Sequence, residues 1–143
     1  MTYEQLTGKL FDSSGAVIGI GYSGAMPAGK NNPAMEGVEG IGPIPCGQYK
    51  IVGPPIDTAH HGPFVLHLIP DDATHTRILT LGRDPLSFLM HGDKIGAPGT
   101  ASEGCIIMSR GVRDQVWAAN ATDPYLQVIS GIINSDIDGK VSA

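Results

Sequence analysis

Short runs of apolar residues, separated by turn-forming residues, recur along the chain. The clearest are residues 48–52 (QYKIV), 63–69 (PFVLHLI), 77–81 (RILTL), 86–91 (LSFLMH) and 125–133 (YLQVISGII). Their lengths are typical of strands, and the 20 glycines and 11 prolines of the chain suit many tight turns. In residues 63–69 both alternating faces are fairly apolar, as in a strand packed on both sides. The pattern therefore predicts a mainly β protein, a sandwich or a barrel.

Two features near the N-terminus refine this prediction. The segments LTGKLFD and AVIGIGYSG flank Ser13, Ser14 and Gly15, and Gly15 can supply the positive φ of a hairpin turn. Residues 25–45 are dense in Gly, Pro and Asn and predict a long ordered loop. Loops of this length inside a compact domain are often functional.

One helix is predicted, over residues 110–120. Ser109 is placed to be its N-cap, and Val112, Val116 and Trp117 form an apolar stripe at helical spacing. We therefore expect one domain over residues 1–143, mainly β, with a single short helix.

Composition and charge narrow the possible functions. Apolar residues make up 41% of the chain and charged residues 16%, which is typical of a folded domain. The net charge is −5 without a Lys/Arg cluster, which disfavours nucleic acid and anionic membrane surfaces as partners. Without an apolar run of about 20 residues, membrane insertion is not expected. The N-terminus has neither a cationic start nor an apolar core, so we expect cytoplasmic synthesis without a signal peptide.

The candidate chemistry lies in His91 and Cys105. His91 ends one apolar run, Cys105 opens another, and the glycine-rich segment between them can fold back. A thiol becomes a useful nucleophile when a nearby imidazolium lowers its pKa. Gly104 would let substrate approach the backbone, and the N–H groups of Gly104 and Cys105 could form an oxyanion hole. A buried core thiol and a structural histidine are the competing interpretations, and spacing alone does not decide between them.

The surrounding motifs resemble L,D-transpeptidases of the YkuD type. Residues 90–92 (MHG) match the His-Gly at a strand end, residues 102–106 (SEGCI) match the Ser-x-Gly-Cys segment, and residues 42–51 (GPIPCGQYKI) resemble the Pro-x-Gly-x-Tyr-x-Ile strand of that family. Glu103 and Ile107 depart from the common motif, and the loop from His to Cys is short. These departures fit the L,D-transpeptidase-like effectors of type VI secretion systems. That branch resembles the chain over nearly its whole length, including residues 21–24, 29–33, 42–45 and 98–105.

The resemblance implies a YkuD-like fold, with Cys105 as nucleophile, His91 as base and Ser102 orienting the site. It implies peptidoglycan stem peptides as substrate, trimmed by L,D-carboxypeptidase action or altered by D-amino-acid exchange, and no cofactor. It further implies injection into the periplasm of target bacteria by secretion machinery, and a cognate immunity protein.

Further residues are candidates for binding substrate. They are Gly92 and Asp93 after the histidine, the cations Arg83 and Arg110, and Lys30, Asn31 and Asn32 in the long loop. A guanidinium binds a carboxylate bidentately, which favours the two arginines. Turn formation competes as the role of Asp93 and of the loop residues, and surface or helix-terminal positions compete for the arginines.

Other possibilities stay open at this point. The histidines at 60, 61, 67 and 75 are too irregularly spaced for a zinc site, and Cys46 is interpreted as a structural thiol, with a disulfide to Cys105 as a minor alternative. A cysteine endopeptidase or amidase of the cell wall is the first alternative function. A non-enzymatic wall-binding module with a buried thiol is the second.

Overall fold

The computed structural model describes residues 1–131, which form nine strands and two α-helices. The strands are β1 (Thr2–Glu4), β2 (Lys9–Phe11), β3 (Val17–Ile20), β4 (Tyr22–Ser23), β5 (Gly47–Thr58), β6 (Gly62–Pro70), β7 (Leu89–His91), β8 (Ile106–Ile107) and β9 (Tyr125–Ile129). The helices are α1 (Asp72–Thr80) and α2 (Arg110–Ala118), with a 3₁₀ turn over Pro33–Met35. The prediction of a mainly β protein is confirmed.

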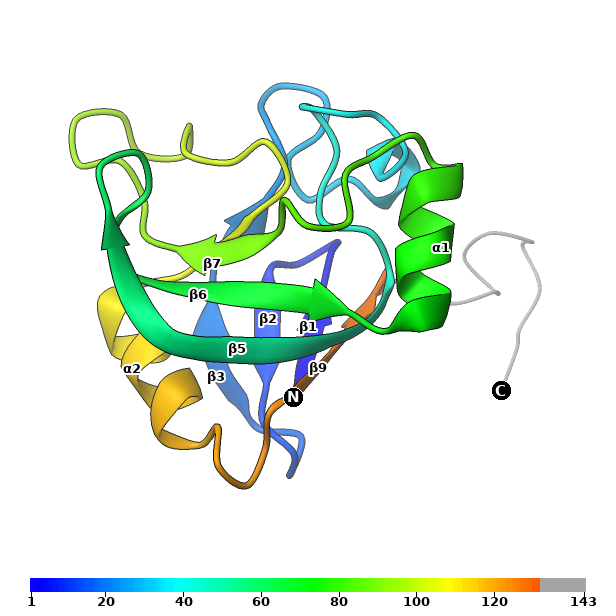
Figure 1. Ribbon diagram of the computed structural model, residues 1–143. Coiled ribbons are helices and arrows are strands. Elements are labelled where there is room, and N and C mark those ends of the chain that lie inside the picture. Colours follow the sequence, from blue (N-terminus) through cyan, green and yellow to red (C-terminus); the bar gives the residue numbers. More distant parts are fainter. Residues whose placement is uncertain (132–143) are drawn as a thin grey trace.

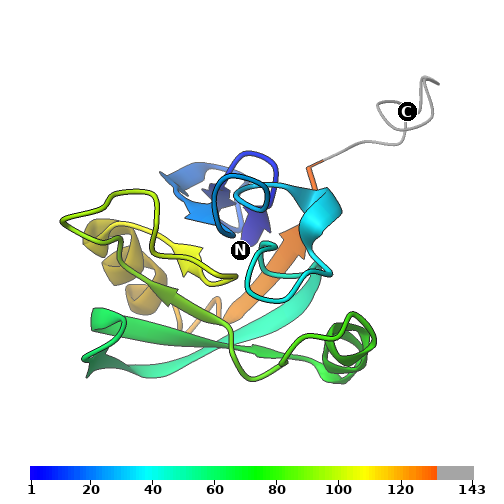
Figure 2. The same ribbon diagram turned by 90° about the horizontal axis from the view of Figure 1, so that it is seen from above.

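The nine strands form one sheet in the order β3-β2-β1-β9-β5-β6-β7-β8-β4. The strands at the two ends of this order, β3 and β4, are separated in sequence by Gly21 alone, so the sheet must curl until its ends meet. The long β5–β6 hairpin runs across the molecule, with α1 at one end and α2 near the other (Figures 1 and 2). β7 and β8 are parallel to each other, which requires the long connection of residues 92–105.

The curled sheet encloses one apolar core. Its fully buried side chains include Tyr3, Leu10, Ile44, Tyr49, Ile51, Leu66, Leu68, Ile78, Met90, Ile106, Met108 and Leu126. Because these residues come from almost every strand, the core fixes the strand ends that carry the candidate site. No helix within residues 1–131 has the length and apolar character needed to cross a membrane.

Several sequence predictions hold at the level of single residues. β2 and β3 form the N-terminal hairpin, and Gly15 has φ +88° in its turn. Ser109 caps α2 by accepting a hydrogen bond from the Val112 N–H at 3.3 Å. The helix ends at Ala118, two residues before the predicted end, with Ala119 as its C-cap.

The strand predicted over residues 77–81 is wrong, because this segment belongs to α1. Asp71 caps that helix by accepting a hydrogen bond from the Thr74 N–H at 2.9 Å. Thr74 and Ile78, four residues apart, form its buried face. Ile78 packs into the core, and the Thr74 hydroxyl accepts from the Gln48 N–H of β5 at 2.9 Å. The expectation of one helix is therefore also wrong. β7 begins at Leu89, later than predicted, and residues 132–133 of the last predicted strand lie outside the described residues.

Candidate active site

A cavity of about 780 Å³ lies where the β5–β6 hairpin, β7 and the 92–105 connection meet. Its lining residues include His60, His61, Arg83, Asp84, Ser87, Phe88, His91, Gly92, Asp93, Glu103, Gly104 and Cys105. The predicted nucleophile and base therefore share one cavity, although fourteen positions separate them in the sequence.

The register of β7 and β8 explains why Cys105 and His91 face the same space. Met90 pairs with Ile106 and His91 with Ile107, and Cys105 directly precedes this pairing. Side chains two positions apart point to the same face of a sheet. Cys105 thus shares the face of Ile107 and of its partner His91, while Met90 and Ile106 point into the core.

The His91 imidazole is oriented to act as a base. Its Nδ1 lies 2.8 Å from the Gly92 carbonyl oxygen, which can only accept, so Nδ1 carries the proton and Nε2 keeps its lone pair. His91 is 3% exposed, and burial lowers the pKa of its imidazole to about 4. The imidazole is therefore neutral at pH 7.

Burial raises the pKa of the Cys105 thiol to about 11, so this group is neutral as well. The sequence suggested a thiol activated by a nearby imidazolium. The structure instead has a neutral thiol, which donates to the Ser87 carbonyl at 3.6 Å, and a neutral imidazole on the wall of the same cavity. A neutral base of this kind can take the thiol proton during attack.

Ser102 organises the loop that carries Cys105. Its hydroxyl donates to the Cys105 carbonyl at 2.6 Å and accepts from the N–H groups of Gly24 at 2.9 Å and Gly104 at 3.1 Å. The side chain is 2% exposed, so none of these bonds competes with water. Ser102 acts as a positioning residue whose hydroxyl fixes the backbone on both sides of Gly104.

This geometry corrects one sequence prediction, the oxyanion donor at Gly104. The Gly104 N–H already donates to Ser102 Oγ, so it is not aimed at a substrate oxygen. Of the two predicted oxyanion donors, the Cys105 N–H is the remaining candidate. The glycine is needed for another reason: its φ of +145° strains other residues, and a Cβ there would collide with Nη2 of Arg83.

Strand β4 links the motif segments that are far apart in sequence. The Ser23 hydroxyl donates to the Gly104 carbonyl at 2.9 Å and accepts from the Ile44 N–H at 2.8 Å. One residue earlier, the Tyr22 hydroxyl donates to Asp93 Oδ1 at 2.6 Å. Asp93 also accepts from the Gly99 N–H at 3.0 Å, so its carboxylate closes the turn that lines the cavity.

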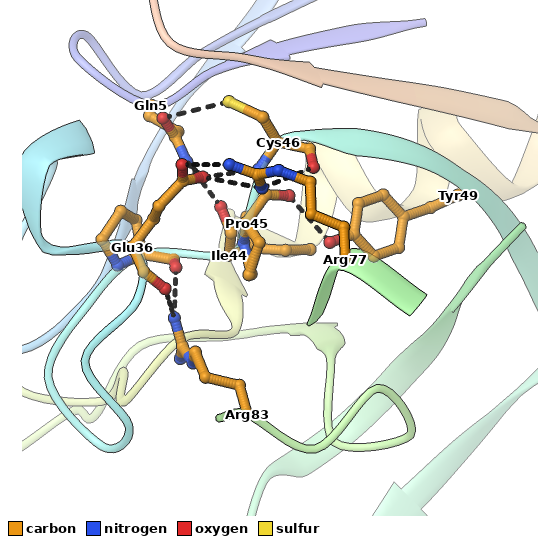
Figure 3. A network of polar contacts seen from close by, with 9 residues as sticks. Gln5, Glu36, Ile44, Pro45, Cys46, Tyr49, Arg77 and Arg83 are labelled. Carbon is orange, nitrogen blue, oxygen red and sulfur yellow. Dashed lines mark hydrogen bonds and ion pairs between the residues drawn. The ribbon is translucent and has the colours of Figure 1, made fainter. Parts of the chain in front are cut away.

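Residues 43–46 are held by side chains that bind their successive carbonyl groups (Figure 3). The donors are Arg83 to Pro43, Gln5 to Ile44, Tyr49 to Pro45 and Arg77 to Cys46, at 2.6 to 3.2 Å. The Glu36 carboxylate pairs with Arg77 at 2.6 Å and accepts from the Cys46 N–H at 2.8 Å. This network, and not covalent cross-linking, fixes the segment; both cysteines are free, and the Cys46 thiol donates to Gln5 at 3.3 Å.

Arg83 connects this segment to the loop that carries Cys105. Its guanidinium donates to the carbonyls of Glu36, Pro43 and Glu103 and is 6% exposed. The predicted arginine thus lines the cavity, but its donors are committed to the backbone. It supports the peptide next to Gly104 and is not set up for bidentate binding of a substrate carboxylate.

Four other predicted binding residues do not line this cavity. Arg110 pairs with Asp114 on the surface of α2 and lies over the Phe64 ring. Lys30 lies over the Tyr22 ring, the Asn31 Oδ1 accepts from the Ser23 N–H, and Asn32 caps the 3₁₀ turn. The three loop side chains therefore contact strand β4 or their own loop.

Sequence reasoning missed the histidines of the β5–β6 hairpin as site residues. His60 and His61 line the cavity, and the His61 ring lies 4.7 Å from the His91 ring, between centroids. The only local signal was the turn sequence before Gly62, since the pairing of β6 with β7 brings the hairpin to His91. Within residues 1–131, no group of three or more His, Cys, Asp or Glu side chains is arranged to hold a metal ion.

Comparison with known proteins decides the family. The family model described as the Tlde1 domain matches residues 19–132, most of the chain. The chain belongs to the Tlde1 domain family. Members of the Tlde1 domain family are L,D-transpeptidase-like effectors of type VI secretion systems, so the resemblance found in the sequence is confirmed. No curated protein and no solved structure matches the chain significantly. The Tlde1 match includes every residue named above as lining the cavity.

Proposed function

We propose that this Tlde1-domain protein is a peptidoglycan-modifying enzyme that acts on tetrapeptide stems through a thioester on Cys105. The observation that carries the proposal is that Cys105, directly before β8, and His91, at the end of the adjacent strand β7, line one cavity. The enzyme removes the terminal D-alanine as an L,D-carboxypeptidase, or replaces it with another D-amino acid as an L,D-transpeptidase.

In the first step, Cys105 Sγ attacks the carbonyl carbon of the third, diamino acid residue. The thiol proton passes to His91 Nε2, and the Gly92 carbonyl stabilises the resulting imidazolium through Nδ1–H. The amide C–N bond breaks, and His91 returns the proton to the departing amine. The products are free D-alanine and an acyl thioester on Cys105.

In the second step, an acceptor releases the acyl group. Water attacks the thioester carbonyl while His91 removes one proton, and that proton goes to the leaving thiolate of Cys105. The product is a tripeptide stem with a new carboxyl group. If the amine of a D-amino acid attacks in place of water, the product is an exchanged tetrapeptide, and the thiol is regenerated in the same way.

The surroundings of the pair support these two steps. We assign the Cys105 N–H as the donor to the developing oxyanion. The hydrogen bond from the Ser102 hydroxyl to the Cys105 carbonyl holds the backbone of this residue in place. Cys105 leads into strand β8 and not into a helix, whereas the nucleophile of papain-like wall hydrolases opens a helix. This placement favours acyl transfer at the stem terminus over cleavage within a bridge.

The biological setting follows from the proposed chemistry and from the family. Trimming and exchange remove the tetrapeptide donors that cross-linking requires, which would make the protein an antibacterial toxin in the periplasm of target cells. A producing cell would then need a cognate immunity protein. Export through the secretion machinery would deliver a protein made in the cytoplasm.

Mass spectrometry of isolated muropeptides tests the proposed function. Wild-type protein should convert tetrapeptide stems into tripeptide stems with the loss of one alanine, and should incorporate an added D-amino acid. Cys105→Ala should do neither. Cys46→Ala is the matched control: it removes the other free thiol, outside the cavity, and should keep the activity.

A further inference from the structure

The β5–β6 hairpin places a second histidine beside the base. The His61 ring centroid lies 4.7 Å from that of His91 with the planes tilted by 55°, and His60 is in turn 4.7 Å from His61. The hairpin is anchored, since Arg113 donates to the carbonyls of Pro63 and Phe64 at 2.7 Å. His61 is half-buried and lines the cavity, so it is held in the space where the reaction takes place.

The chemistry of the leaving group restricts where its carboxylate can lie. His91 protonates the departing amine in the proposed mechanism, so the amine nitrogen lies next to this ring. In an α-amino acid a single carbon atom separates that nitrogen from the carboxylate. The carboxylate must therefore lie beside His91, within reach of the side chains that contact the His91 ring.

Two charged residues of the cavity wall follow His91 in the chain: the Asp93 carboxylate accepts from Tyr22, Lys94 and Gly99, and Lys94 is an exposed cation that the experiment below tests as the competing carboxylate ligand. The remaining charged groups of the wall lie on its other side. The Arg83 guanidinium donates to three backbone carbonyls, two of them in the loop that contains Glu36 and Pro43, so Arg83 belongs to the side of the cavity formed by that loop. The carboxylates of Glu39, Asp84 and Glu103 also belong to that side, because Arg83 ties Glu103 to it and Asp84 follows Arg83 in the chain. Figures 1 and 2 place this loop and the tip of the β5–β6 hairpin on opposite sides of β7. The carboxylates of Glu39, Asp84 and Glu103 repel an anionic group from the first side.

We propose that His61 binds the terminal α-carboxylate of the leaving D-amino acid and so makes the enzyme specific for stems that end in a free carboxylate. This rests on the proposed function. His61 donates an imidazole N–H to the carboxylate, while His91, next to it, handles the proton of the adjacent amine. The same contact would select free D-amino acids as acceptors in the exchange reaction, since they carry the same carboxylate.

The experiment compares two tetrapeptide stems, one ending in D-alanine and one in D-alaninamide, which lacks the negative charge. Wild-type protein should prefer the free acid by roughly tenfold or more in kcat/KM, as expected for a hydrogen bond to a charged group. His61→Phe keeps a ring against His91 but removes the donor. It should lose this preference through a higher KM for the acid, with little change for the amide. His61→Gln, which keeps a donor, should retain part of the preference.

Controls separate this role from a structural one. His75→Phe makes the same change on α1, outside the cavity, and should leave both substrates unaffected. Lys94→Gln removes an exposed cation of the cavity wall and should keep the preference for the acid.

Three results would overturn the assignment. They are equal losses on both substrates in His61→Phe, loss of the preference in Lys94→Gln, and a wild-type enzyme that cleaves both stems equally well. The last result would leave the Cys105 chemistry standing. Cleavage by Cys105→Ala, or no cleavage of either stem by wild type, would instead refute the proposed function and this inference with it.

Discussion

Ser102→Ala is the substitution whose effect the structure defines most fully. The change removes one hydroxyl that serves three buried backbone groups, the N–H groups of Gly24 and Gly104 and the carbonyl of Cys105. A hydrogen bond contributes about 1 kcal/mol net, and a buried group left unpaired costs about 1–3 kcal/mol. Since Ser102 is 2% exposed and water cannot readily replace the hydroxyl, we expect a loss of about 3 kcal/mol in the free energy of unfolding. For a domain of this size, that corresponds to a fall of about 10 °C in Tm.

Urea denaturation of the purified protein measures this loss, and Ser109→Ala is the matched control. Ser109 makes one exposed capping bond, to the Val112 N–H, so its removal should cost about 1 kcal/mol. Ser102→Ala should also lower kcat, because the backbone of Cys105 is no longer held, whereas Ser109→Ala should leave kcat unchanged. If Ser102→Ala destabilises the protein no more than Ser109→Ala, the positioning role assigned to Ser102 is wrong.

Three more substitutions probe the site and its support. Gly104→Ala should lower stability by at least about 2 kcal/mol and abolish activity, whereas Gly96→Ala, on the same connection with open space around it, should change stability by less than about 0.5 kcal/mol in thermal denaturation. In the unfolded state His91 takes up a proton at its ordinary pKa, whereas in the folded state it does so only near pH 4, so the free energy of unfolding falls as the pH falls between these values. Between pH 7 and pH 4.5, urea titrations of His91→Gln should show a loss of unfolding free energy about 2 kcal/mol smaller than that of wild type. Equal losses would contradict the buried neutral imidazole. Burial alone would raise the pKa of Glu36, but hydrogen bonds from the surrounding donors hold it below its usual range. Glu36→Gln should therefore lower the free energy of unfolding by about 2 kcal/mol. Glu39→Gln, at an exposed position three residues on, should leave it nearly unchanged.

The parts of the site that the sequence could predict are those encoded locally. His91, Ser102 and Cys105 lie in short motifs at strand ends, and the structure places Ser102 and Cys105 three positions apart in one bonded loop. The direction of the Gly104 N–H was not predictable, although this residue belongs to the same motif. Its bond to Ser102 depends on a backbone φ of +145°, which residue identity permits but does not specify.

The parts that the sequence could not predict depend on pairing between distant strands. His61 reaches His91 because β6 pairs with β7, so the turn sequence before Gly62 predicted a turn but not a place in the site. Arg83 was expected to face a substrate, but three carbonyls from two separate loops surround it in the fold. The segment 77–81 contains enough apolar residues for a strand. The N-cap at Asp71 and the burial of Ile78 in the core stabilise a helix here instead.

The most direct test of the account is the incubation of purified tetrapeptide muropeptides with wild-type protein and with Cys105→Ala, followed by mass spectrometry. We expect conversion to tripeptide stems with release of one D-alanine for wild type, and no conversion for a Cys105→Ala protein whose circular dichroism and Tm show that it is folded. Release of D-alanine by Cys105→Ala at the wild-type rate would contradict the assignment of Cys105 as the nucleophile.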